Sequence, residues 1–417
     1  MTDPLLLGGV LIACFVAFNI GGSTTGPAFG PAIGAGVLSK TTAGALMGVA
    51  FFVGAYTIGR RVVDTLGTDL VHDPSVFTLE SSIIVLFFIG GALLIGNLSG
   101  APASTSMTAV GAIIGLGFAA GELNLAVIGE ILAWWILSPI IGFWMAVMIG
   151  RYGYEALDRF VAIEQSEGPL VVFERVNVGV RPVLRPGETR TIALEQAEVQ
   201  LRPTLGPNTS RREFIGTAVL VTIGCLMAFS SGTSNIANAI APLVGSGALA
   251  MEPGIFIGCG AVAVGALTIA RRTMETLGND ITDLPLTAAI VVAVLSSTIV
   301  ILLSLLGIPA SFVVVATVCI VGLGWGRSTS AVSVTDAARG RVSPEVSLDA
   351  LAEKSATPPI GESASELAVI GTRRSDTPAR SELFDPGTTV RVILMQNVVP
   401  LLATAGSYLT FLLLNVV

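Results

Sequence analysis

Ten long apolar runs, almost free of charge, dominate this chain of 417 residues. Outside two polar segments, 290 residues carry only five basic and twelve acidic side chains. A run of roughly 20 apolar residues can cross the ~30 Å hydrocarbon core of a bilayer as a helix, whose backbone hydrogen bonds are all internal. The runs lie near residues 5–22, 41–59, 80–97, 104–120, 124–149, 213–230, 253–270, 285–306, 309–325 and 392–417. The sequence therefore predicts an all-α polytopic membrane protein.

The composition excludes several classes of protein. Only 12% of the residues are charged, about half the share of a soluble globular domain, which excludes a water-soluble enzyme. A net charge of −7 without a basic stripe argues against nucleic-acid binding. The sequence has no nucleophile–base pair and no G-x-x-x-x-G-K-[ST] loop, so ATP is not the direct driver. The four cysteines lack metal-ligand spacing. We expect no enzymatic activity, no cofactor and no metal site.

Two polar segments interrupt the apolar body. Residues 151–212 hold nine arginines and eight acids, and their alternating stretch at 191–203 suggests a small β-rich module or a linker. Residues 326–391, rich in Ser, Ala, Thr, Pro and Glu, have the composition of a flexible linker. The remaining parts are a first transmembrane repeat at 1–150, the main part of a second repeat at 213–325, and a last helix at 392–417.

The two halves of the apolar body repeat each other. Residues 18–36 align with 229–247 at an offset of 211, which places Gly21 over Gly232. Further aligned blocks are 60–70 with 271–281 and, at an offset of 207, 100–104 with 307–311. Each half has five apparent crossings, and an odd number turns the second half upside down in the membrane. The sequence thus predicts two inverted-topology repeats, the plan of many secondary transporters.

The same parity gives an orientation. Both polar segments fall on one face, opposite the N-terminus, and arginines flank the apolar runs there. They are Arg151, Arg159, Arg211, Arg212, Arg327 and Arg391. Because positive charge collects on the cytoplasmic side, we predict a multi-pass protein of the cell membrane with cytoplasmic linkers.

Residues rich in Gly, hydroxyl and amide groups are the candidate site. The stretches 26–38 and 237–249 are too short and too rich in Gly, Pro and Ala for spans, so we expect broken or re-entrant helices, unwound at Gly21–Thr25 and Gly232–Asn238. Unwinding exposes N–H groups and helix N-termini, which suit an anion. The candidate substrate-binding residues are Ser23, Thr24, Thr25, Ser104, Thr105, Ser234, Asn235, Asn238 and Ser311. The alternative is that the small residues only allow close helix packing.

These blocks resemble the inorganic phosphate transporter (PiT) family. The stretch 232-GTSNIANA-239 is similar to that family's G-A-N-D-V-A-N-A signature, and 100-GAPASTSM-107 and 307-GIPASFVV-314 resemble its G-x-P-x-S-T-T-H. The signature Asp falls at Thr24 and Asn235, so this chain lacks the two carboxylates that the resemblance would assign to cation coupling. The sulfate permease branch of that family is also poor in this Asp, and 19-NIGGSTTG-26 together with 104-STSMTAVGAIIG-115 is similar to it. The resemblance implies phosphate or sulfate as substrate.

Acidic residues inside or beside the apolar runs are candidates for coupling to Na+ or H+. They are Glu130, Asp69, Asp280, Asp64 and Glu275. Two of them have an arginine four residues earlier, Arg60 before Asp64 and Arg271 before Glu275, a spacing at which each pair can neutralise itself. The alternative for Asp69 and Asp280 is a position in water at the membrane interface. Trp134, Trp135 and Trp144 suggest an interfacial belt or packing.

The preferred hypothesis is a secondary active transporter of a small inorganic oxyanion, phosphate ahead of sulfate, that works as a cation-coupled symporter by alternating access. A sulfate permease and a passive anion channel are alternatives on the same scaffold. A receptor or scaffold whose polar segments carry the function is a third class. The oligomeric state stays open, a homodimer included.

Overall fold

The structure, a computed structural model, describes residues 4–34, 37–98, 104–154, 156–157, 171–177, 199–205, 211–270, 286–328 and 386–414. Among these residues, seven helices are long and apolar enough to cross a membrane, and three further apolar helices are shorter. The predicted all-α polytopic membrane protein is confirmed by this architecture.

Within its described residues, the first half contains the α-helices α1 to α6 and four shorter helical segments. The α-helices are α1 (Pro4–Gly34), α2 (Lys40–Gly54), α3 (Arg60–Asp64), α4 (Leu79–Leu98), α5 (Thr105–Ala120) and α6 (Leu125–Met148). Three π-helical segments, η1 (Ala55–Gly59), η2 (Thr65–Asp69) and η4 (Ile149–Gly153), extend α2, α3 and α6, and the 3-10 turn η3 (Pro74–Val76) precedes α4. The second half contains α8 (Arg211–Gly245), α9 (Met251–Leu267), α11 (Leu286–Leu305), α12 (Phe312–Ser328) and α15 (Pro386–Leu414).

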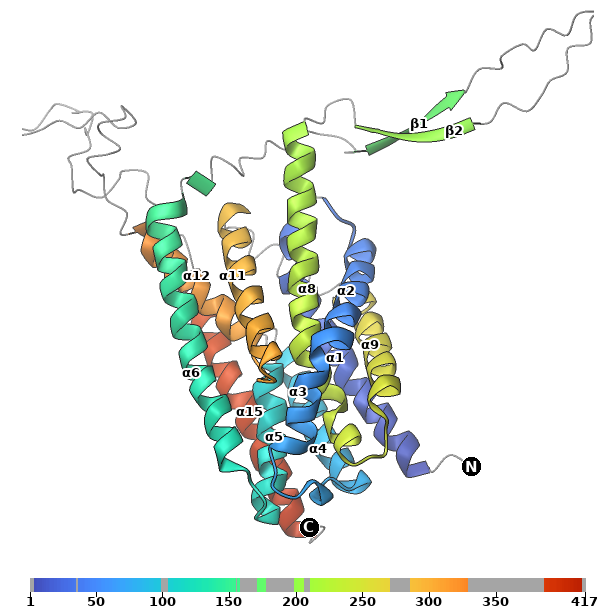
Figure 1. Ribbon diagram of the computed structural model, residues 1–417, viewed down its shortest axis with the longest axis vertical. Coiled ribbons are helices and arrows are strands. Elements are labelled where there is room, and N and C mark those ends of the chain that lie inside the picture. Colours follow the sequence, from blue (N-terminus) through green and yellow to red (C-terminus); the bar gives the residue numbers. More distant parts are fainter. Residues whose placement is uncertain are drawn as a thin grey trace, which may run out of the picture. The chain divides into compact units, whose positions relative to one another are not determined.

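Two helical hairpins replace four of the expected crossings. Before α4 and after α5, the chain pairs at Val71 and Leu123, and the His72 N–H donates to the Glu122 carbonyl at 2.7 Å. This hairpin therefore enters and leaves at one end of the bundle, while α11 and α12 form a hairpin at the other end (Figure 1). The two tips meet, since Ser106 lies 3.0 Å from the Ala310 carbonyl. Each hairpin thus reaches only part of the way through the bundle.

The expected helix breaks at the glycine-rich blocks are wrong. Helix α1 continues without interruption through residues 21–25, and α8 continues through 232–238. The short stretches predicted to be re-entrant are the last turns of these two helices as far as Gly34 and Gly245. One reason is that Ser and Thr hydroxyls in a helix can bond to a carbonyl one turn back. The re-entrant elements are instead the hairpins.

The glycines of these blocks serve close packing between α1 and α9. A Cβ on Gly21 would lie 2.1 Å from the Val262 carbonyl oxygen, and a Cβ on Gly265 would lie 2.1 Å from the Phe18 carbonyl oxygen. Only a residue without a side chain allows the two backbones to approach so closely.

The same contact recurs between α2 and α8. A Cβ on Gly232 would lie 2.1 Å from the Phe51 carbonyl oxygen, and a Cβ on Gly54 would lie 2.1 Å from the Phe229 carbonyl oxygen. The offset of 211 found in the sequence relates these two crossings residue by residue. The repeat therefore encodes two equivalent helix crossings, each between one helix of the first half and one of the second.

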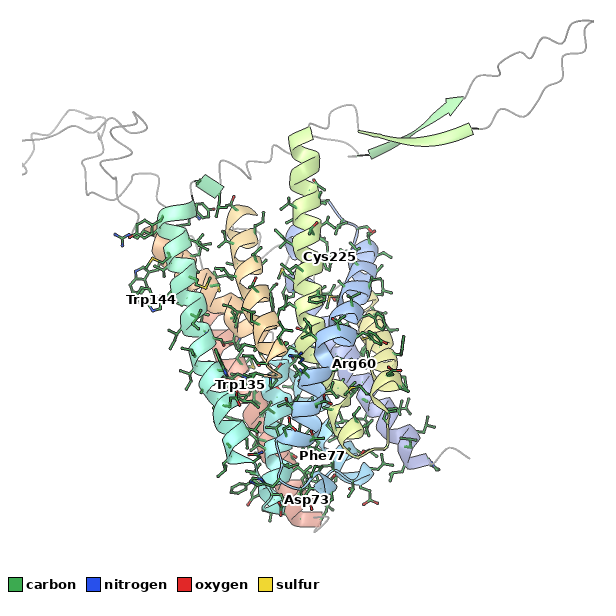
Figure 2. The ribbon with its side chains drawn as sticks, in the orientation of Figure 1. Arg60, Asp73, Phe77, Trp135, Trp144 and Cys225 are labelled. Atoms are coloured by element: carbon green, nitrogen blue, oxygen red, sulfur yellow. The ribbon has the colours of Figure 1, made fainter. Side chains whose placement is uncertain are left out.

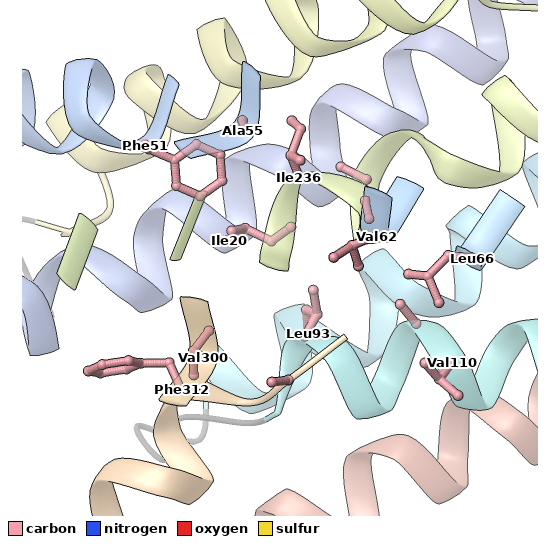
Figure 3. Close-up of a cluster of buried hydrophobic side chains, with 14 of the residues drawn as sticks. Ile20, Phe51, Ala55, Val62, Leu66, Leu93, Val110, Ile236, Val300 and Phe312 are labelled. Atoms are coloured by element: carbon pink, nitrogen blue, oxygen red, sulfur yellow. The ribbon is translucent and has the colours of Figure 1, made fainter. Parts of the chain in front are cut away.

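Apolar side chains from both halves form one buried core (Figure 3). Ile20, Leu93 and Val110 from the first half and Ile236 and Val300 from the second are all buried in it. The two halves therefore fold as a single packed unit.

A second compact unit covers Val161–Val219. Its strands β1 (Val171–Asn177) and β2 (Val199–Leu205) are antiparallel, with Val171 opposite Leu205 and Asn177 opposite Val199. Strand β2 overlaps the stretch whose alternation suggested β structure. The domain boundaries given above stay predictions, and most of the polar segment at 326–391 lies outside the described residues.

Candidate functional site

Small polar side chains gather where the two hairpin tips meet α8. The Ser234 hydroxyl donates to the Ala310 carbonyl at 2.9 Å and accepts the Ala310 N–H at 3.0 Å. The Ser106 hydroxyl donates to the same carbonyl at 3.0 Å. These bonds join α5, α8 and the loop between α11 and α12. The tip cluster, as we call it, consists of Thr105, Ser106, Ser231, Ser234, Asn235, Asn238 and the backbone of Ala310.

Asn235 lies at the centre of the tip cluster. Its Oδ1 accepts hydrogen bonds from the Thr105 hydroxyl at 2.6 Å and from Asn238 Nδ2 at 3.1 Å, and its own Nδ2 donates to Ser231 Oγ at 2.9 Å. Asn238 is fully buried, yet its Oδ1 has no partner among the described residues. Leaving a buried acceptor unsatisfied costs about 1–3 kcal/mol, so this oxygen marks a place for a further donor.

Two helix N-termini point into the same region. Ser104 caps α5 by accepting the Met107 N–H at 3.2 Å, and Ser311 caps α12 by accepting the Val314 N–H at 3.3 Å. The N-terminus of a helix carries partial positive charge and free N–H groups, which favour a bound anion. All side chains of the tip cluster are uncharged. The site therefore offers hydroxyls, amides and helix ends rather than basic groups.

Two further side chains donate hydrogen bonds to the backbone at the loop between α11 and α12. Trp135 of α6 donates its indole N–H to the Pro309 carbonyl at 2.7 Å, a role beyond the predicted belt or packing. Trp144 lies farther along α6, exposed beside the Phe143 ring (Figure 2). The Arg61 guanidinium donates to the Leu305 carbonyl at the end of α11. These two contacts involve backbone carbonyls, which no sequence motif marks.

The α1 hydroxyls predicted as ligands are engaged differently. Ser23 and Thr24 donate to the Ile20 carbonyl at 3.1 and 2.7 Å, and Thr25 donates to the Gly21 carbonyl at 2.6 Å. No hydrogen bond in the described part of the chain joins them to the tip cluster. The structure brings together the other six candidates, which are Ser104, Thr105, Ser234, Asn235, Asn238 and Ser311. Ser106 and Ser231 were missed, although both lie in the same polar blocks.

The direct ion pair of Arg60 is with Glu252 rather than with Asp64, the residue that its spacing suggested. Arg60 Nη2 lies 3.2 Å from Glu252 Oε1 of α9, and its guanidinium lies 4.4 Å from the centre of the Tyr56 ring. This ion pair ties α3 to α9 at an exposed position. Asp64 is exposed and lacks an ion pair within the residues that the structure covers.

The other coupling candidates lie apart from the tip cluster. Glu130 is exposed on the second turn of α6, and Asp69 is exposed at the end of η2. Beyond that end, the Asp73 carboxylate accepts the Ser75 N–H at 2.9 Å, which lowers the pKa of Asp73. Arg271, Glu275 and Asp280 lie outside the described residues. Among the described residues, no group of three or more His, Cys, Asp or Glu could hold a metal ion.

Comparisons with known proteins identify the family of this chain. The model of the Phosphate transporter family, PHO4, matches residues 20–343. Sulfate permease CysP of Bacillus subtilis is 28% identical over 323 residues, covering 77% of this chain and 78% of that protein. A putative phosphate permease of Pyrococcus furiosus is 27% identical over 379 residues, covering 80% and 90%. One from Chlamydia muridarum is 28% identical over 397 residues, covering 79% and 92%.

A solved structure has the same fold. It is described as "The sodium-dependent phosphate transporter", has a TM-score of 0.65 and 16% sequence identity, and the match covers 100% of both chains. The resemblance drawn from the polar blocks is therefore confirmed. Because the family match spans most of the sequence, the chain belongs to the phosphate transporter family.

Proposed function

We propose that this anion transporter carries inorganic phosphate by cation-coupled alternating access and binds it at the tip cluster. The observation that carries the proposal is the meeting of two helix N-termini with buried hydroxyls and amides at Ala310. Such groups bind a small tetrahedral oxyanion without basic side chains. The transporters of this family give no reason to expect enzymatic activity.

The choice of phosphate ahead of sulfate rests on Asn238. Near neutral pH phosphate still carries a proton and can donate a hydrogen bond, whereas sulfate can only accept. The buried Oδ1 of Asn238, which has no partner in the described part of the chain, suits that phosphate O–H. Sulfate remains the second candidate, because a sulfate permease is among the relatives and the signature Asp is replaced by Thr24 and Asn235.

Cation coupling is supported by the charge of the substrate. The tip cluster is neutral, so a bound dianion would lack a counter-charge, and a bound Na+ or H+ would supply it. The similar solved structure is named as sodium-dependent. Asp64, Asp69, Glu130, Glu275 and Asp280 remain our candidates for coupling.

Alternating access is supported by the architecture. The two halves have the same order of helices, and their hairpins enter from opposite ends of the bundle (Figure 1). Transporters with inverted repeats move one unit against the other around a central site. We also propose a cell-membrane location with the polar segments in the cytoplasm. A passive anion channel is the competing function, favoured by the loss of the signature carboxylates.

The test is uptake into proteoliposomes with an imposed Na+ or H+ gradient. We expect labelled phosphate to accumulate above its outside concentration under one of the two gradients. Excess sulfate should compete weakly, and the reverse experiment should show phosphate displacing sulfate. Phosphate that only equilibrates under both gradients would indicate the channel. Sulfate accumulation that phosphate does not inhibit would indicate the sulfate permease.

A further inference from the structure

One long span changes character halfway along its length. The span Lys40–Asp69 consists of α2, η1, α3 and η2 in sequence. In its first half the exposed side chains include Val49 and Val53, which are 66% and 45% exposed. In its second half a row of exposed residues is polar, with spacings of four, three and four residues that place them on one helix face. This polar face consists of Thr57, Arg61, Asp64 and Thr68.

The polar face reaches deep into the span. Arg61 is eight residues from the end of the span at Asp69, which is about 12 Å along a helix axis. The 30-residue span is about 45 Å long as a helix, longer than a bilayer core of about 30 Å, so its ends do not fix the depth of Arg61. A contact does: the Arg61 guanidinium donates to the Leu305 carbonyl at the inner end of α11, close to where the two hairpin tips meet inside the bundle. Charged groups exposed at that depth are costly in lipid and normally face a water-filled cavity or a partner.

Arg61 turns toward the protein rather than toward the membrane surface. Helix α11 ends in a Schellman turn, in which the Gly307 N–H donates to the Ser304 carbonyl at 3.0 Å and the Ile308 N–H donates to the Leu303 carbonyl at 2.9 Å. Gly307 has a φ of +79°, as this turn requires. The carbonyl of the next residue, Leu305, accepts no hydrogen bond in this turn. The Arg61 guanidinium, which lies outside the turn, donates a hydrogen bond to it.

The turn that Arg61 holds leads directly to the tip cluster. A Cβ on Gly307 would lie 2.8 Å from the Thr65 hydroxyl, so the turn packs tightly against η2. Three residues later, Ala310 bonds to Ser234 and Ser106. One short loop therefore connects Arg61 of the polar face to the proposed anion site.

We propose that the polar face lines a water-filled entrance and that Arg61, in its inner half, docks the oxyanion before it reaches the tip cluster. A guanidinium can bind two oxygens of a tetrahedral oxyanion at once. Arg61 is free of an ion pair within the described residues, where its guanidinium donates to a backbone carbonyl. Arg60 cannot serve in the same way, because it is paired with Glu252. The docking role rests on the proposed function, whereas the entrance does not.

The entrance is tested by thiol accessibility in the full-length protein. Thr57→Cys and Thr68→Cys are compared with Val49→Cys and Val53→Cys, four exposed positions on one span, with wild-type labelling subtracted for the native cysteines. A charged methanethiosulfonate reagent reacts only with thiols in water. We expect the two polar-face positions to react at least tenfold faster than the two valine positions. Equal rates would overturn the entrance, whether or not the protein transports an anion.

The docking role is tested by the kinetics of phosphate and sulfate uptake. Arg61→Gln should raise KM about tenfold, the effect of losing one charge-assisted hydrogen bond. Arg61→Lys should lie between Gln and wild type, because it keeps the charge but loses the planar fork. Arg60→Gln, the matched control, should stay within about twofold of wild type. An unchanged KM in a folded Arg61→Gln protein would overturn the docking role. Wild-type protein that transports neither anion would instead refute the proposed function, and labelling would still decide the entrance.

Discussion

Helices α1 and α8 carry equivalent sequence blocks but use them differently. Both cross a partner helix through a glycine that no other residue could replace without moving the backbone, Gly21 in one and Gly232 in the other. Next to these glycines, Thr24 of α1 bonds to a carbonyl of its own helix, while the aligned Asn235 of α8 bonds to Thr105 of α5. The same position thus serves local helix bonding in one half and contact between helices in the other.

The comparison separates two roles of the repeat. The glycine crossings depend on how closely two helix backbones can approach. That geometry is the same in both halves, because the glycines recur at the same positions of the repeat. The polar chemistry depends on single side chains, which have diverged between the halves. We infer that packing in this fold is symmetric while the anion site is built mainly on α8. Each prediction below tests one side of that division.

The largest effect is expected at the glycine crossings. Gly21→Ala and Gly232→Ala would each place a Cβ 2.1 Å from a carbonyl oxygen of a neighbouring helix. We expect each change to cost about 3 kcal/mol of stability, the upper range for overpacking a core. Thermal unfolding in detergent should show similar losses for both variants, because the two crossings have the same geometry.

Gly30→Ala is the matched control within α1. A Cβ there meets no atom within 4 Å, so the change should stabilise the helix by up to about 1 kcal/mol. If Gly21→Ala were as harmless as Gly30→Ala, the close crossing would be wrong. If only one of the two crossing variants were destabilised, the symmetry of packing would be wrong.

A smaller effect on folding but a large effect on transport is expected at Asn235. Asn235→Ala leaves Thr105, Ser231 and Asn238 without a hydrogen-bond partner at the tip cluster. We expect the KM for phosphate uptake to rise roughly 10- to 100-fold, corresponding to the loss of one or two hydrogen bonds in a buried site. The measurement is initial uptake rate against phosphate concentration in proteoliposomes.

Thr24→Ala is the control for that comparison, since it alters the aligned position of α1. It removes one bond within the helix, and we expect KM to change less than about twofold. Equal increases at both positions would show that α1 contributes to the anion site as much as α8. Such a result would favour a symmetric site and refute the division drawn here.

The sequence predicted the class of fold because that class depends on local composition. Apolar runs of sufficient length specify membrane helices, and the aligned blocks identified the repeat. Sequence could not show that residues 21–25 remain helical. A Ser or Thr whose hydroxyl bonds to its own helix and one that lies in an unwound segment are the same residue in the sequence. Gly21 is required by its close contact with Val262, and the residues around either position in the sequence do not indicate that contact.

The hairpins illustrate a second reason why sequence could not predict the whole fold. Helix α4 is as long and apolar as a crossing helix, so its composition does not say how deep it goes. Only the contact between Ser106 and Ala310 shows that the tips of the two hairpins meet inside the bundle, so that neither hairpin crosses it. All nine candidate site residues were chosen because they lie in polar blocks, and the structure brings six of them together. The contacts of Arg61 and Trp135 could not be predicted, because each side chain donates to a backbone carbonyl far away in the sequence, Arg61 at the end of α11 and Trp135 in the loop that follows.

The smallest effect is expected at the two caps, where the halves should again be equivalent. Ser104 and Ser311 accept N–H groups of α5 and α12 at nearly equal distances, 3.2 and 3.3 Å. Ser104→Ala and Ser311→Ala should each cost about 1 kcal/mol, the usual value of an N-cap, measured by thermal unfolding. Asp is also a good N-cap, so Ser104→Asp and Ser311→Asp should retain stability. Their negative charge would nevertheless repel an oxyanion and raise KM, because the caps lie beside the tip cluster. Asp variants that keep both stability and wild-type KM would place the anion away from the hairpin tips. An increase in KM for Ser311→Asp alone would place the anion at the tip between α11 and α12, to which Ser234 is bonded.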